Sequence, residues 1–255
     1  MLKKRIIPIQ LLINSGRLVK TTNFGNYRDV GDPVASSKIY NAQYADELIL
    51  LNIDRENRSI NLLVDVLWRV SEACFMPLAV GGGMKSFDDA KVLITGGADK
   101  VVLNSVCYSN PALITEIVEI YGSQAVTVSI DAAWDDRLQD YALYADCGRR
   151  KEELRLPEHI ARVVEAGAGE ILINSIDRDG TMSGYDIELL RRVTSISPIP
   201  VIACGGAGNY LHLKEALVEA EVSAAACGSL FNFGDNNPIR AKAFLTNYGI
   251  PLKVI

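Results

Sequence analysis

The stretch Glu47-Leu-Ile-Leu-Leu-Asn-Ile-Asp-Arg55 returns as Glu170-Ile-Leu-Ile-Asn-Ser-Ile-Asp-Arg178, 123 residues further along the chain. The same offset superposes a proline and a glycine pair that follow each copy: Pro77, Gly82 and Gly83 fall on Pro200, Gly205 and Gly206. With one more residue of offset, Ser105 falls on Ser229. Chance similarity between apolar strands would not usually keep such landmarks in one register, so the repeat predicts two homologous halves.

Each copy begins with an apolar run, and six similar runs lie elsewhere in the chain. The eight predicted strands cover residues 5–11, 47–53, 77–80, 100–103, 125–130, 170–173, 200–203 and 222–226. Continuous rather than alternating hydrophobicity indicates strands that are buried on both faces, as in parallel sheets covered by helices. Helical spacing appears between the runs, as in 59–73 and 156–166, and N-caps are predicted at Asp32, Ser86 and Asn110.

Eight such units in 255 residues average about 32 residues each, the size of one strand and one crossover helix. The total matches an eight-fold barrel. We therefore predict an α/β fold, a (β/α)8 TIM barrel built from two homologous half-barrels, with residues 1–255 forming a single domain. A doubly wound open sheet is the structural alternative, but it gives no reason for two matched halves.

Composition excludes several classes of protein. The chain is 49% hydrophobic and 22% charged, which excludes a disordered or fibrous polypeptide, and its net charge of −5 argues against nucleic acid as a partner. Pro8 and Gln10 interrupt the apolar run after the basic start, which favours a buried strand over a signal peptide, and no run is long enough to span a membrane. Five scattered cysteines and two histidines predict reduced thiols in a cytoplasmic protein with no metal and no cofactor.

Glycines and small polar residues follow four of the predicted strands. In a barrel these positions lie at the carboxyl-terminal mouth, where backbone N–H groups can approach an anion. Each half would then offer one phosphate cradle; the first comprises Gly82, Gly83, Asn104 and Ser105, and the second comprises Gly205, Gly206, Gly228 and Ser229. Ordinary βα turns also favour glycine, but two matched sets favour a substrate with a phosphate at each end.

Several motifs together resemble one enzyme family. They are Ile6-Ile7-Pro8, Gly31-Asp32-Pro33, Val80-Gly81-Gly82-Gly83, Gly122-Ser123-Gln124-Ala125, Ser129-Ile130-Asp131-Ala132, Ser175-Ile176-Asp177-Arg178-Asp179-Gly180-Thr181 and Gly205-Gly206-Ala207-Gly208. Over nearly the whole chain they resemble the cyclase subunit of imidazole glycerol phosphate synthase. The resemblance implies a barrel that binds a bisphosphorylated ribulosyl aminoimidazole carboxamide ribotide. It also implies a glutaminase subunit on the amino-terminal face, which feeds ammonia through the barrel for cleavage and imidazole closure.

The resemblance also assigns residues at the mouth. Asp131 matches one of the family's two acid/base carboxylates, but Leu11 stands where the other is expected, and no Asp or Glu occurs before Asp29. Loss of such a group typically lowers the rate by ~10²–10⁴, which puts imidazole closure in doubt. Asn52 also replaces a usual aspartate. Further phosphate contacts are expected from Asp179, Gly180 and Lys20; the alternative for the lysine is a solvated loop side chain.

Four charged residues begin predicted strands: Arg5, Glu47, Lys100 and Glu170. In the family these positions form the gate through which ammonia enters, and the alternative is that they are ordinary solvated strand ends. The resemblance also places Asp99 and Gln124 near the contact with the glutaminase subunit.

Leu11-Leu12, the segment Gly16-Arg17-Leu18-Val19-Lys20 and the segment Cys74-Phe75-Met76-Pro77 more closely resemble a diverged branch. Its cyclase-like proteins are associated with amidation of sugars in bacterial surface polysaccharides (lipopolysaccharide, O-antigen), beside a glutaminase-like partner and a separate sugar amidotransferase. We therefore expect an ammonia-channelling barrel in sugar amidation. The alternatives are an authentic cyclase (lyase) of histidine biosynthesis and a catalytically silent subunit that activates a glutaminase.

Overall fold

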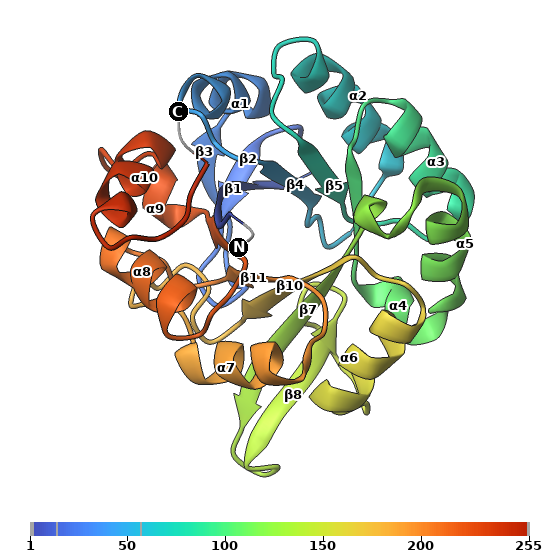
Figure 1. Ribbon diagram of the computed structural model, residues 1–255. Helices are drawn as coiled ribbons and strands as arrows, with labels where there is room; N and C mark the ends of the chain where they lie inside the picture. Colours follow the sequence, from blue (N-terminus) through green and yellow to red (C-terminus); the bar gives the residue numbers. More distant parts are fainter. Residues whose placement is uncertain (1–2, 14, 57, 254–255) are drawn as a thin grey trace.

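The computed structural model describes residues 3–13, 15–56 and 58–253 and forms a closed barrel of eight parallel strands (Figure 1). The strands are β1 (Arg5–Leu12), β4 (Leu48–Asn52), β5 (Leu78–Gly81), β6 (Lys100–Leu103), β7 (Val126–Asp135), β10 (Glu170–Ser175), β11 (Val201–Cys204) and β12 (Ala224–Cys227). Each pairs with its neighbour in chain order, and the ring closes where β1 pairs with β12, with Arg5 opposite Ala224. The predicted (β/α)8 barrel is confirmed.

Helices surround the ring of strands (Figure 1). They are α1 (Pro33–Ala42), α2 (Ile60–Ser71), α3 (Phe87–Thr95), α4 (Ser105–Ser109), α5 (Ala112–Tyr121), α6 (Leu156–Glu165), α7 (Ile187–Ile196), α8 (Tyr210–Val218), α9 (Ser229–Asn232) and α10 (Pro238–Thr246), with a 3₁₀ turn η1 (Ser123–Ala125). Asp32 caps α1, and Ser86 forms a capping box on α3, as predicted. The N-cap prediction at Asn110 is wrong: Asn110 ends the short helix α4, and the next helix begins after Pro111.

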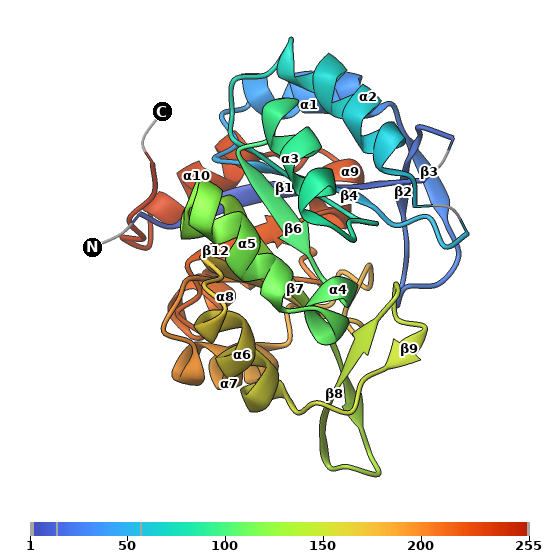
Figure 2. The same ribbon diagram turned by 90° about the vertical axis from the view of Figure 1, so that its right-hand side faces the viewer.

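Short strands that the hydrophobic pattern did not reveal project from one end of the barrel (Figure 2). They are β2 (Leu18–Lys20), β3 (Arg28–Gly31), β8 (Asp140–Ala145) and β9 (Arg150–Lys151). β8 pairs antiparallel with the second half of β7, which is why β7 runs five residues past the predicted end of its strand. The other three have only two to four residues, too few to show a period in the sequence.

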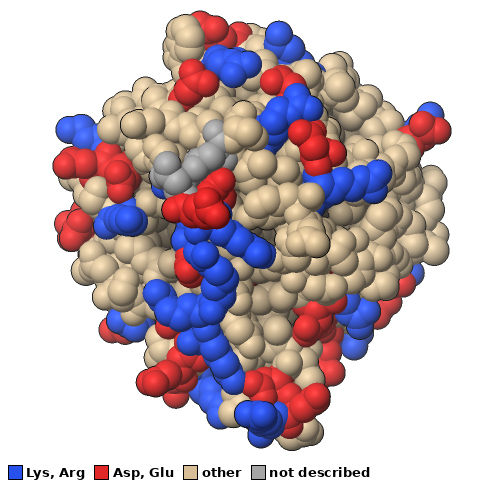
Figure 3. Space-filling view, turned by 180° about the vertical axis from the view of Figure 1, so that it is seen from behind, with Lys and Arg blue, Asp and Glu red and all other residues tan. Residues whose placement is uncertain are grey.

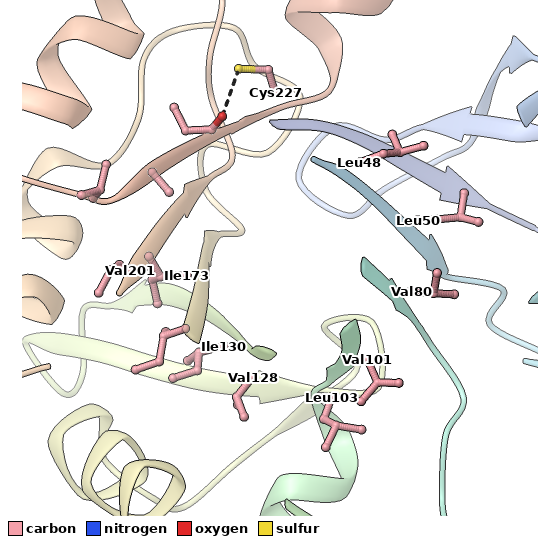
Figure 4. Packing of buried hydrophobic residues seen from close by; sticks show 14 of the residues in the cluster. Leu48, Leu50, Val80, Val101, Leu103, Val128, Ile130, Ile173, Val201 and Cys227 are labelled. Carbon is pink, nitrogen blue, oxygen red and sulfur yellow. Dashed lines mark hydrogen bonds between the residues drawn. The ribbon is translucent and has the colours of Figure 1, made fainter. Parts of the chain in front are cut away.

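Side chains alternate along the strands between two buried clusters. Leu48 and Leu50 point outward and pack under the helices, in the larger cluster that Figure 4 shows in part. Ile49, between them, points into the barrel and joins an inner cluster with residues such as Ile202 and Ala224. Among the described residues, no helix is long and apolar enough to cross a membrane.

Candidate active site at the carboxyl-terminal mouth

A cavity of about 630 Å³ opens at the carboxyl ends of the strands. Its lining includes every residue that the sequence analysis placed at the mouth: Lys20, Gly82, Gly83, Asn104, Ser105, Asp131, Asp179, Gly180, Gly205, Gly206, Gly228 and Ser229. Figure 3 views this end of the molecule, and Lys and Arg side chains form a band across it. A cavity that gathers backbone donors and cations suits an anionic ligand.

The two glycine pairs adopt matching backbone conformations. Gly82 and Gly205 have φ of +101° and +88°, and the glycine after each is also at positive φ. A Cβ on Gly82 would lie 2.1 Å from the Asn52 carbonyl oxygen, and one on Gly205 would lie 2.7 Å from the Ser175 carbonyl oxygen. Asn52 and Ser175 are themselves 123 residues apart, so the sequence repeat is reproduced in the loops. Only glycine allows this close backbone approach.

The side chains beside the first glycine pair already have protein partners. Asn104 Nδ2 donates to the Ser129 carbonyl oxygen and to Asp131 Oδ2, both at 3.1 Å. Ser105 Oγ accepts from the Asp146 backbone N–H at 2.9 Å. The side chain of Asn104 therefore positions the carboxylate of Asp131, a role that its place in the sequence did not suggest.

Asp131 lies on β7 opposite Asn174 of β10 and is 8% exposed. Burial raises the pKa of Asp131 to about 7; the amides of Asn174 and Asn104 oppose this shift, and the charge of Asp179 adds to it. Because that value is close to neutral pH, the carboxyl group can both accept and donate a proton. The geometry suits the acid/base role predicted for this residue.

Leu11 also lines the cavity, on β1 between Val19 of β2 and Leu51 of β4. Its two cross-strand partners, Val19 and Leu51, are apolar as well, so within the described part of the chain neither supplies the missing carboxylate. Asn52, at the end of β4, is used in its own loop, where Nδ2 donates to the Ser59 carbonyl oxygen and Oδ1 accepts from the Asp54 N–H.

Lys20 points into the barrel. Its side chain is buried, and Nζ donates to the Ile9 carbonyl oxygen at 3.1 Å. A Cβ on Gly228 would lie 2.0 Å from this Nζ, so the amine rests against the backbone of the second predicted cradle. The alternative of a solvated loop lysine is wrong, because the antiparallel pairing of β2 with β1 turns the side chain inward.

Asp179 fastens one loop of the mouth to another. Its carboxylate accepts from Thr21 Oγ1 at 2.6 Å, and its carbonyl oxygen accepts from the Asn23 N–H at 2.9 Å. Gly180 packs so closely here that a Cβ would lie 2.0 Å from the Thr21 carbonyl oxygen. Burial raises the pKa of Asp179, and the Thr21 hydroxyl and the charge of Lys20 oppose this.

Other lining residues carried no recognisable motif. Arg58 pairs with Asp146, which also pairs with Arg149, so the turn between β8 and β9 is fastened to the loop after β4. Cys204 ends β11 inside the cavity, where burial raises the pKa of its thiol to about 12. Sequence gives no signal for either feature, except that Cys204 immediately precedes Gly205. Among the described residues, no cluster of His, Cys, Asp and Glu could hold a metal ion.

At the opposite end, the four predicted gate residues form a ring of ion pairs. Arg5 contacts Glu47 and Glu170, each at 2.6 Å, and Lys100 contacts the same two carboxylates at 2.9 and 2.8 Å. Their side chains are only 3–23% exposed. The alternative of independent solvated strand ends is therefore wrong, because every charge has two partners across the barrel axis.

Two further features surround this ring. Above it, Glu47 Oε1 and Thr127 Oγ1 are buried with no hydrogen-bond partner in the described part of the chain, and the inner apolar cluster lies between them and the mouth. Beside it, Asp99 and Gln124 are exposed at the same end: Asp99 accepts from the Leu78 N–H, and Gln124 donates to the Tyr121 carbonyl oxygen.

Comparison with known proteins identifies relatives over the full length. The chain is 43% identical to the imidazole glycerol phosphate synthase subunit HisF of Caulobacter vibrioides, covering 100% of this chain and 97% of the relative. The proteins of the same name from Alkaliphilus metalliredigens and Staphylococcus carnosus are 42% and 38% identical, each over 99% of this chain and 100% and 99% of the relative. Residues 5–237 match the family described as "Histidine biosynthesis protein". The chain therefore belongs to the histidine biosynthesis protein family.

Proposed function

We propose that this chain is the ammonia-accepting, cyclase-type subunit of a glutamine amidotransferase pair and acts on a substrate that carries a phosphate at each end. The observation that carries this proposal is the arrangement of the barrel axis, with a ring of ion pairs at one end and a cavity containing Asp131 at the other. The names of the three relatives support the same class of reaction, a lyase step in imidazole formation.

At the mouth, the matched loops after β5 and β11, with those after β6 and β12, would hold the two phosphates through backbone N–H groups. Asp131 would move protons at the reacting carbon and nitrogen atoms, since a group with a pKa near neutral is effective in both directions. The wall that contains Leu11 provides shape and excludes water but supplies no second carboxylate.

Ammonia would enter through the ring at the amino-terminal end, supplied by a glutaminase subunit bound near Asp99 and Gln124. The unpartnered polar atoms of Glu47 and Thr127 could receive a small polar molecule just above the ring. The apolar inner cluster would then favour neutral ammonia over ammonium on the way to the mouth.

Sugar amidation, in which the barrel passes ammonia to a separate amidotransferase, is a second candidate, and Leu11 is the observation that favours it. The names of the relatives support the cyclase of histidine biosynthesis better. A silent subunit that only activates a glutaminase would have no use for a buried Asp131 with a raised pKa.

The bisphosphorylated ribulosyl substrate with ammonium salt at pH 8 separates these candidates. A cyclase should form the imidazole product without the partner, and Leu11→Asp should raise that rate by restoring the second carboxylate. Leu11→Asn is the matched control, because the amide has nearly the shape of aspartate but cannot exchange a proton. If neither the natural chain nor Leu11→Asp turns over the substrate, while the substrate binds, the cyclase proposal fails and sugar amidation gains support.

The proposed ammonia route is tested in the reconstituted pair with glutamine as the nitrogen source. Lys100→Ala and Glu170→Ala should leave partner binding nearly intact, yet release ammonia to solvent instead of product. A matched control is Lys91→Ala, on an exposed lysine of α3 outside the cavity. Unchanged coupling in both ring variants, or a native-cell pull-down without a glutaminase, would contradict this route.

A further inference from the structure

Lys20 is a buried amine with little to stabilise a positive charge. Its side chain is 6% exposed, and its one recorded hydrogen bond goes to the Ile9 carbonyl oxygen. Among the described residues, no carboxylate lies within ion-pair distance of Nζ, and Leu11 on the adjacent strand is apolar. An ammonium group has three donors to satisfy, so this environment favours the neutral amine.

The groups around the amine also favour its neutral form. Cys204 and Gly228 line the cavity near Lys20, and neither carries a charge. Burial lowers the pKa of Lys20, and the charge of Asp179 opposes this without forming an ion pair. A desolvated, uncharged lysine is the form that adds to carbonyl compounds.

The amine also lies beside an anion site. Its Nζ rests against Gly228, which immediately precedes Ser229 at the start of α9, where the second cradle is proposed. A phosphorylated ligand held there would place its next few carbon atoms in the cavity, within reach of the amine.

We propose that Lys20 forms a covalent imine with the carbonyl group of a phosphorylated ketose-type substrate. The inference rests on the proposed function in one respect, that the substrate carries both a phosphate and a ketone. The neutral amine attacks the carbonyl carbon and forms a C–N bond. The resulting carbinolamine then loses its oxygen as water, which carries away both amine protons, and no electrons are gained or lost. Asp131, in the same cavity, can pass the proton that this loss of water requires.

Imine formation would give the ammonia channel a defined target. Once Asp131 returns a proton to the imine nitrogen, ammonia arriving through the barrel can add to the imine carbon. A proton then passes from the added nitrogen to the lysine nitrogen, the lysine leaves as the free amine, and the substrate remains as its own protonated imine. The exchange forms one C–N bond and breaks another. It does not need the carboxylate that is missing at Leu11, because the electrophile is already activated as a cation.

The test uses the chain alone, without ammonia or a partner, and ribulose 5-phosphate as the probe. After reduction with cyanoborohydride, peptide mapping by mass spectrometry should find one adduct per chain, on the peptide that contains Lys20. Lys20→Arg should reduce labelling by roughly tenfold or more, whereas Lys91→Arg, at an exposed lysine of α3 outside the cavity, should not. Labelling should reach half its maximum below the ordinary lysine pKa of about 10.4.

The peptide map of the unmodified chain needs no variant, so a folding defect in Lys20→Arg cannot obscure the result. Calorimetric binding of the probe without any adduct would overturn the proposal and make Lys20 a phosphate-binding cation, leaving the proposed function intact. An adduct spread over exposed lysines, or concentrated on a lysine other than Lys20, would also overturn it. Absence of binding altogether would count against both this proposal and the phosphate sites.

Discussion

The barrel buries charged groups at both ends, but the two ends surround them differently. In the amino-terminal ring, each of Arg5, Glu47, Lys100 and Glu170 contacts two groups of opposite charge. At the mouth, the hydrogen bonds to Asp131 and from Lys20 involve neutral amide and carbonyl groups. Paired charges partly compensate one another for the loss of water, although burial still raises the pKa of Glu47, whereas unpaired charges lack that compensation. The first arrangement holds four charges in fixed positions around the barrel axis, and the second gives groups that can react.

If the mouth is the reacting end, Asp131→Asn should have the largest effect of any single substitution. We expect ammonia-dependent turnover of the bisphosphate substrate to fall by ~10²–10⁴, because the amide cannot exchange a proton. Product formation followed by chromatography measures this. Asp136→Asn, on an exposed carboxylate of the adjoining hairpin, is the control and should be unaffected. Equal rates for both variants would show that Asp131 takes no part in the reaction.

If the ring is a compensated unit, Glu170→Gln should destabilise the fold strongly. The substitution leaves Arg5 and Lys100 with one carboxylate between them, and breaking a buried pair typically lowers the free energy of unfolding by about 3–5 kcal/mol. Urea unfolding measures the loss. Adding Lys100→Met to the variant should restore part of it, because the excess positive charge is then gone. If the double variant loses more free energy of unfolding than the two single variants lose together, the pairing argument is contradicted.

The mouth should show the opposite behaviour, in which neutralising a charge stabilises the protein. The pKa of Asp131 is about 7 when folded, above its unfolded value of 3.8, so the folded state holds the proton more tightly. The free energy of unfolding therefore falls as pH rises from about 4 to about 7, by up to about 4 kcal/mol for this group. Asp131→Asn should remove that slope. Urea unfolding of both proteins at pH 5 and pH 8 tests this. If the difference in free energy of unfolding between Asp131→Asn and the natural chain is not larger at pH 8 than at pH 5, the burial argument is contradicted.

An exposed ion pair gives the smallest expected effect. Arg191 and Glu219 contact at 3.1 Å, but both side chains are about half exposed. Arg191→Ala should change the free energy of unfolding by no more than about 1 kcal/mol. A loss similar to that of Glu170→Gln in the same urea experiment would show that burial is not what distinguishes the ring.

Much of the fold and of the mouth could be predicted from the sequence, and there are physical reasons why the remaining features could not. The barrel followed from eight apolar runs and a repeat, and the lining of the mouth followed because residues after barrel strands must meet at one end. Side-chain pairing could not be predicted: Asn104 bonds Asp131, and Lys20 turns inward, only because of strand register and rotamers. The short hairpin strands and the Arg58–Asp146 contact were missed, since neither produces a periodic pattern.

The pairing of β1 with β12 has a consequence for how the chain is made. The first barrel strand leaves the ribosome more than 200 residues before the strand that completes its hydrogen bonds, a delay of roughly 10–50 seconds at ordinary rates of synthesis. Throughout that interval one edge of β1 presents free N–H and C=O groups, which invite pairing with other chains. Newly made protein should therefore depend on chaperones until β12, in about the last eighth of the chain, emerges, and truncations before Ala224 should aggregate.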